Sequence, residues 1–71
     1  MTTGDIYFLA QPLEEIPSGF YAIVEVGVLV TLSRLRENED GHMSTTWRHV
    51  KVTWQEMEQF VWLEAAVELL N

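Results

Sequence analysis

The side chains with the most chemical potential in this 71-residue chain are two histidines, three serines and a pair of adjacent glutamates. Neither His42 nor His49 belongs to an HExxH arrangement, and the chain has no cysteine to complete a metal site. The serines lack the glycine-flanked context of a nucleophile, and no glycine-rich phosphate loop is present. Glu14 and Glu15 are neighbours and do not form a facing acid–base pair. We therefore expect no enzyme activity, no metal and no cofactor.

The basic residues cluster in one stretch of the sequence and consist of Arg34, Arg36, Arg48 and Lys51. Trp47 lies among them, and basic side chains beside an aromatic ring can contact phosphates and stack a base. However, the formal net charge of the chain is −7, and the acids within 37–40 nearly cancel the local positive charge. Such a field repels a polyanion. The pattern favours a solvated β-ribbon whose charges discourage edge aggregation, and direct nucleic-acid binding is not expected.

The acidic excess permits the inverse role, in which the protein occupies a basic groove that normally holds nucleic acid. Glutamates would then stand in for phosphates, and the candidates are Glu14, Glu15, Glu64 and Glu68. The alternative is that these charges only keep the protein soluble, as acidic residues do whatever the function. Mimicry predicts a binding affinity that falls steeply with salt.

Size and composition limit the architecture to one domain spanning residues 1–71. A chain of this length with 48% hydrophobic residues can bury a small core but has no room for a large internal pocket. Asp5 stands where a secretory signal would carry positive charge. The longest apolar run, 20–32, includes Glu25 and is shorter than the roughly 20 residues of a membrane span. We expect a soluble, cytoplasmic protein without a membrane partner.

Apolar and aromatic residues predict strands at 5–10 and across 20–36. The intervening residues 11–19 contain two prolines and predict a loop, with room for one helical turn at 12–16. A straight strand over 20–36 would be too long for the domain, so Gly27 is the expected bend or bulge.

The sequence NEDG at 38–41 predicts the turn that joins 20–36 to a strand at 43–53. A three-residue loop pairs Asn38 with His42 and sets Val30 opposite Val50. A two-residue loop would set Val30 against Lys51. Same-face apolar pairing favours the three-residue loop.

The C-terminal residues 53–71 predict a helix. Thr53 and Glu56 have the spacing of a capping box, in which each side chain accepts a hydrogen bond from the other's backbone N–H. At 100° per residue, Phe60, Leu63, Val67 and Leu70 form one apolar stripe that faces the sheet. A second stripe consists of Trp54, Val61, Ala65 and Leu69, with Trp62 at its border.

These elements predict an α+β fold, in which a small antiparallel sheet of two or three strands, with a long central hairpin, packs against one C-terminal α-helix. Such a sheet covers only one face of the helix. Either the loop at 11–19 or the N-terminal strand covers the second face, or another chain does. The second possibility predicts a protein-binding surface, because tryptophan is enriched among binding hot spots. Its residues are Val61, Trp62, Ala65, Leu69, Glu58, Glu64, Glu68 and Trp47.

The predicted function is that of a non-enzymatic module that occupies the surface of another protein. In size, acidity and lack of catalytic motifs, the chain resembles the small inhibitors that phages and mobile elements use against host defence, anti-CRISPR proteins among them. The resemblance extends to no residue motif. It implies an inhibitor that acts on a host protein or complex in the host cytoplasm. The alternative is a small structural subunit that uses its C-terminal helix to form a homodimer or larger homo-oligomer.

Overall fold

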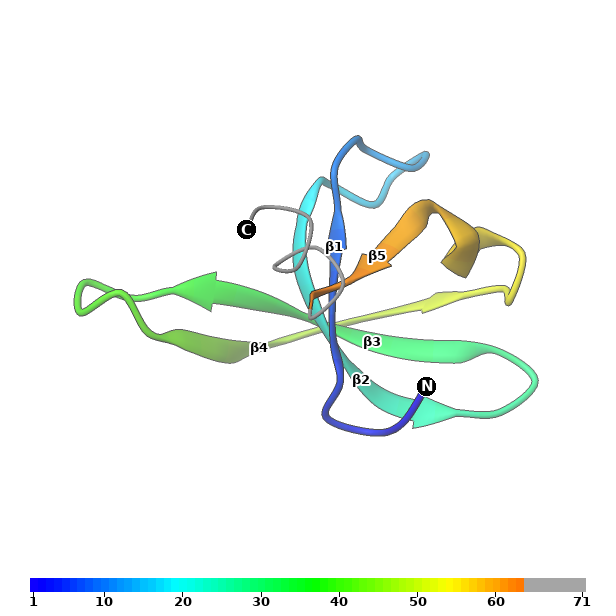
Figure 1. Cartoon of the computed structure of the whole chain (residues 1–71), viewed down its shortest axis with the longest axis horizontal. Coiled ribbons are helices and arrows are strands. Elements are labelled where there is room, and N and C mark those ends of the chain that lie inside the picture. The colour runs from blue at the N-terminus through cyan, green and yellow to red at the C-terminus, as the bar shows by residue number, and fades with distance from the viewer. Residues whose placement is uncertain (64–71) are drawn as a thin grey trace.

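The protein is described by a computed structural model over residues 1–63, in which five strands form one antiparallel sheet (Figure 1). The strands are β1 (Ile6–Leu9), β2 (Gly19–Val26), β3 (Val30–Glu37), β4 (Met43–Val52) and β5 (Phe60–Trp62). A short 3₁₀ helix, η1 (Glu56–Gln59), joins β4 to β5. The strand order is β4-β3-β2-β1-β5, so β4 and β5 are the two edge strands.

The predicted α+β fold is wrong, because residues 56–62 form η1 and β5 where one continuous α-helix was expected. The sheet also has five strands and not two or three. Phe60, Val61 and Trp62 are aromatic or β-branched, and such residues favour strands. They pair with Leu9, Phe8 and Tyr7 of β1, respectively. Long-range pairing with the edge of β1 therefore overrides the helical spacing of apolar residues. The remainder of the predicted helix, 64–71, lies outside the described residues.

The predicted capping box is confirmed, although it begins a 3₁₀ helix. The backbone N–H of Thr53 donates to Glu56 Oε1 at 2.8 Å, and the backbone N–H of Glu56 donates to Thr53 Oγ1 at 3.0 Å. The helix ends at Gln59, because Phe60 adopts extended backbone angles while its N–H donates to the Met57 carbonyl. The local start signal was correct, and the helix is simply much shorter than predicted.

The expected bend at Gly27 is a complete chain reversal. The backbone N–H of Gly27 donates to the Leu29 carbonyl at 3.1 Å, and β3 runs back antiparallel to β2. A second irregularity lies at Val24, where the β2–β3 register shifts by one residue. Residues 20–36 are therefore two paired strands, which resolves the excessive length of a single one.

The hairpin of β3 and β4 has the predicted tip but a different register further along. The N–H of Asn38 donates to the His42 carbonyl at 2.8 Å, as the three-residue loop requires. Val30, however, pairs with Val52 and not with Val50, because β4 has two more residues than β3 between the tip and this pair. An insertion of two residues keeps each side chain on its predicted face.

The loop at 11–19 forms a tight turn and not the helical turn considered for 12–16. Leu13 and Ile16 exchange backbone hydrogen bonds of 2.9 and 2.8 Å across Glu14 and Glu15. Both Leu13 and Ile16 pack against the core. This loop thus contributes to the core of the sheet, whereas the intramolecular alternative had it covering the second face of a helix that is not formed over 56–62.

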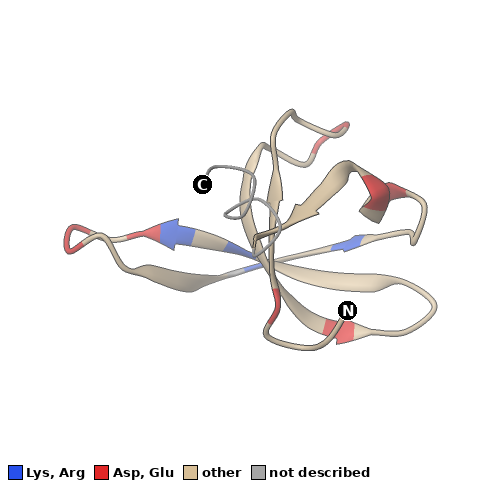
Figure 2. Ribbon diagram, in the orientation of Figure 1, with Lys and Arg blue, Asp and Glu red and all other residues tan. Residues whose placement is uncertain are grey.

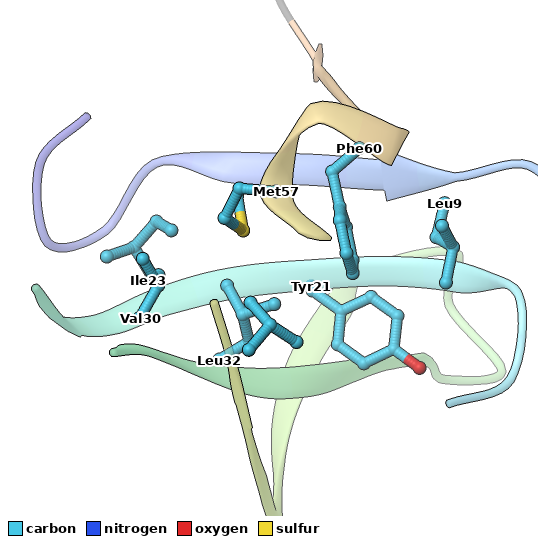
Figure 3. Close-up of a cluster of buried hydrophobic side chains, with 8 residues drawn as sticks. Leu9, Tyr21, Ile23, Val30, Leu32, Met57 and Phe60 are labelled. Atoms are coloured by element: carbon cyan, nitrogen blue, oxygen red, sulfur yellow. The ribbon is translucent and has the colours of Figure 1, made fainter. Parts of the chain in front are cut away.

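The core lies between the sheet and η1 (Figure 3). Its buried residues are Leu9, Tyr21, Ile23, Val30, Leu32, Val52, Met57 and Phe60. The rings of Tyr21 and Phe60 meet edge to face with centroids 5.7 Å apart. The fully buried Tyr21 donates its hydroxyl hydrogen to the Pro17 carbonyl at 2.6 Å, so its one polar group is satisfied.

Candidate protein-binding surface

Three of the predicted binding residues lie on β5 and η1. Val61 and Trp62 are 39% and 44% exposed, and Glu58 is exposed on η1. Successive residues of a strand point to opposite faces of the sheet. Val61 and Trp62 therefore do not form the single apolar stripe that a helix would have given them.

The remaining predicted binding residues are separated from these or are not described. Trp47 lies on β4, at the opposite edge of the sheet from β5. Ala65, Leu69, Glu64 and Glu68 fall outside the described residues. The structure thus brings Val61 and Trp62 onto one short edge strand but does not unite them with Trp47.

An exposed apolar cluster that the sequence analysis missed lies at the turn between β2 and β3. We name it the turn patch, and its residues are Val26, Val28, Leu29 and Trp54. Val28 is 93% exposed, and nearly half of the Trp54 surface is accessible. A fully exposed valine at a turn contributes no apolar burial to folding, so this cluster needs an explanation outside the core. The sequence signal that could have revealed the turn patch is Gly27 within a run of valines. A chain reversal at Gly27 places the neighbouring valines at an exposed turn.

Trp54 is held against this turn by a hydrogen bond. Its indole Nε1–H donates to the Gly27 carbonyl at 2.8 Å, although the two residues are 27 positions apart. The bond ties the connection between β4 and η1 to the β2–β3 turn. Trp54 therefore presents its ring from a fixed position and not from the outer face of a helix, as the sequence analysis expected.

Charge is distributed unevenly over the molecule (Figure 2). All four basic residues lie on β3 and β4, as predicted, whereas acids occupy the tip of that hairpin, η1 and the loop at 11–19. One shallow hollow is lined by Glu14, Glu15, Ile16, Val50, Lys51 and Glu56. This acidic corner unites two of the candidate phosphate mimics with a third glutamate from η1, but Lys51 partly offsets their charge.

Hydrogen bonding and burial explain the perturbed titratable groups. The pKa of the Asp5 carboxyl is lowered, first by the backbone N–H of Thr2 at 2.9 Å and then by the Thr2 hydroxyl at 3.0 Å. Burial raises the pKa values of the Tyr7 and Tyr21 hydroxyls. Within residues 1–63, no three metal-ligating side chains come together, and no helix is long and apolar enough to cross a membrane.

No family model, no curated protein and no solved structure matches this chain. The exposed surfaces described above are therefore the basis for a functional proposal.

Proposed function

We propose that this protein is a non-enzymatic binding module that occupies the surface of another protein through its turn patch. The observation that carries the proposal is the nearly complete exposure of Val28 beside a tryptophan fixed by its own hydrogen bond. An aromatic side chain held in place before binding loses little conformational entropy when a partner covers it. Tryptophans with this property are typical binding hot spots.

The mode of action that we propose is inhibition by steric occupation. Within residues 1–63 the core is filled by apolar side chains, and the exposed side chains of the turn patch can cover a functional patch on a larger protein. The net charge of −7 would accelerate association with a basic partner. These properties support the class of small inhibitors that phages and mobile elements direct at a host protein in the host cytoplasm, with nucleic-acid mimicry by the acidic corner as one version.

The test is a pull-down from host lysate with the wild-type protein and two charge variants. Val28→Asp alters the turn patch, and Met43→Asp introduces the same charge at another exposed apolar residue, at the other end of the β3–β4 ribbon. We expect the wild type and Met43→Asp to capture the same protein and Val28→Asp to lose it. Capture that is equally strong with Val28→Asp would show that the turn patch is not the contact surface.

The alternative is a homo-oligomer that assembles through β5. Val61 and Trp62 are exposed on this edge strand, and unpaired strand edges readily pair with another chain. Analytical ultracentrifugation of the wild type and Trp62→Glu distinguishes the two. A wild-type dimer that Trp62→Glu converts to a folded monomer supports self-assembly, and a monomeric wild type excludes it.

A further inference from the structure

A second exposed feature lies beside the β3–β4 hairpin, at the end of β3 away from the turn patch. A hollow of about 630 Å³ is lined by Arg34, Leu35, Arg36, Glu37, Thr46 and Arg48, and we name it the arginine hollow. Three positive charges and one negative charge leave it with a formal charge of +2. The net charge of the protein is −7, yet three of its four basic residues line the arginine hollow.

A bulge in β4 builds this hollow. Ser33 pairs with His49 and Leu35 pairs with Thr45, so that residues 46–48 of β4 lie opposite Arg34 alone. The bulge therefore brings Arg48 alongside the arginines of β3. A bulge that redirects side chains in this way is a common feature of binding sites.

Hydrogen bonds fix the backbone of the bulge. The Thr46 hydroxyl donates to the Arg34 carbonyl at 2.8 Å, and the Ser33 hydroxyl donates to the Thr46 carbonyl at 2.9 Å. The backbone N–H of Arg48 in turn donates to Thr46 Oγ1 at 3.3 Å. The backbone positions from which the Arg34 and Arg48 side chains extend are thus fixed before a ligand binds.

Arg34 is the most sheltered of the three arginines. It is half-buried, whereas Arg36 and Arg48 are exposed. Its guanidinium lies over Gly19, where an added Cβ would be 3.8 Å from Nε and 4.0 Å from Nη2. A guanidinium partly removed from water interacts more strongly with an anion than a fully solvated one does.

We propose that the arginine hollow binds a single oxyanion group, a carboxylate or a phosphate, presented by an acidic segment of a protein. Guanidinium groups offer planar pairs of N–H donors that match both oxyanions in two-point contacts. Glu37 at the rim, with Glu39 and Asp40 beyond it at the hairpin tip, limits the site to one compact anion. A nucleic-acid backbone would place further phosphates against these acids.

The proposal is independent of the turn patch and can be tested with peptides. The ¹⁵N-labelled protein is titrated with a glutamate-containing peptide, with its phosphoserine counterpart and with a single-stranded oligonucleotide. The arginine Nε–Hε signals are followed by NMR. We expect saturable shifts of the signals of Arg34, Arg36 and Arg48 with at least one peptide. The tighter of the two peptides identifies whether carboxylate or phosphate is the preferred group.

Charge-removing variants separate a specific site from general attraction. Arg36 and Arg48 are exposed, so we expect Arg36→Gln and Arg48→Gln to leave the fold intact. We expect each to weaken peptide binding about tenfold. Lys51→Gln is the matched control, because Lys51 lies in the acidic corner and outside the arginine hollow. Equal weakening by Lys51→Gln, tighter binding of the oligonucleotide, or no saturable shift with either peptide would overturn the proposal.

Discussion

Glu14 has a backbone conformation that side-chain-bearing residues rarely adopt. Its φ is 54°, and it is the one residue other than glycine with positive φ within 1–63. The tight turn between Leu13 and Ile16 requires this conformation, because both exchanged hydrogen bonds close across it. A left-handed backbone costs an L-residue about 1–2 kcal/mol. The folded chain tolerates this cost while it packs Leu13 and Ile16 onto the core.

Replacing Glu14 by glycine should therefore stabilise the protein. We expect Glu14→Gly to raise the free energy of unfolding by about 0.5–1 kcal/mol, since glycine adopts positive φ without the Cβ penalty but loses more backbone entropy. Urea denaturation measures the change. Glu15→Gly is the matched control, and it should lower stability because φ at Glu15 is not positive. A destabilised Glu14→Gly variant would contradict the assigned strain.

The buried hydroxyl of Tyr21 should make stability depend on alkaline pH. Burial raises its pKa above the unfolded value near 10, although the neighbouring charge of Arg34 partly lowers it. The folded protein then holds this proton more tightly than the unfolded chain does. The contribution to stability is fully present below pH 10 and is lost as pH rises through the folded pKa.

Tyr21→Phe should flatten this alkaline decline, as chemical denaturation at a series of pH values between about 8 and 11 would show. At neutral pH the variant should lose about 1 kcal/mol with the bond to the Pro17 carbonyl. Tyr7→Phe is the control for the loss at neutral pH, because the Tyr7 hydroxyl makes no hydrogen bond to described residues. Its pKa is also raised, so Tyr7→Phe should likewise reduce the alkaline decline. An unchanged alkaline decline in Tyr21→Phe would assign the effect to other groups.

At the scale of secondary structure, the short-range signals predicted where elements begin, and long-range pairing decided where they end. Thr53 and Glu56 carry the information for a helix start within four residues, and their bonds are formed. The end of η1 depends on β1, because Phe60 leaves the helix to pair with Leu9. The spacing of apolar residues within 53–71 gives no information about the free edge of β1, which lies more than 40 residues earlier in the chain.

The difference between short-range signals and long-range pairing also explains which parts of the candidate binding surface could be predicted. Exposure of Val61 and Trp62 was one of two alternatives that the sequence left open. Their positions relative to each other differ from the prediction, because they lie on a strand and not on a helix. The turn patch was missed because Gly27 was interpreted as a bend, and a bend leaves Val28 within a strand. The arginine hollow depends on a bulge that apolar pairing of Val30 with Val50 did not reveal.

Removing the capping box should shorten the lifetime of η1 and destabilise the fold. We expect Thr53→Ala to lower the free energy of unfolding by about 1 kcal/mol, because the Glu56 N–H loses its acceptor. Thermal or urea denaturation provides the measurement. Thr53→Ser keeps the hydroxyl and should retain most of the stability. Equal losses in Thr53→Ala and Thr53→Ser would indicate that the methyl group matters and not the cap.

At the scale of the whole molecule, the separation of charges is the dominant feature. Basic residues occupy β3 and β4, and acids lie at the tip of that hairpin, on η1, in the loop at 11–19 and at Asp5 and Glu25 (Figure 2). The composition predicted this excess, and the position of the basic residues in one hairpin was also correct. The sequence could not predict that the hairpin would gather three arginines around one hollow, because that requires the register of both strands.

Added salt should stabilise the folded protein. A net charge of −7 makes the compact state repel itself more than the expanded unfolded chain does. Sodium chloride screens this repulsion over a Debye length of about 10 Å at 0.1 M. We expect the thermal midpoint to rise between low salt and about 0.2 M salt at neutral pH. A falling midpoint would show that attraction between opposite charges outweighs the repulsion.

The position of β1 between β2 and β5 has a consequence for how the protein is made. Synthesis proceeds from the N-terminus, so β1 leaves the ribosome before the other four strands. β2 can then pair with it, followed by β3 and β4, before β5 has emerged. The other edge of β1 stays open until Trp62 has emerged, because only then can β5 pair with Tyr7. Phe60 and Met57 complete the core at the same late stage. The nascent chain therefore carries an open strand edge and an incomplete core until Trp62 has emerged.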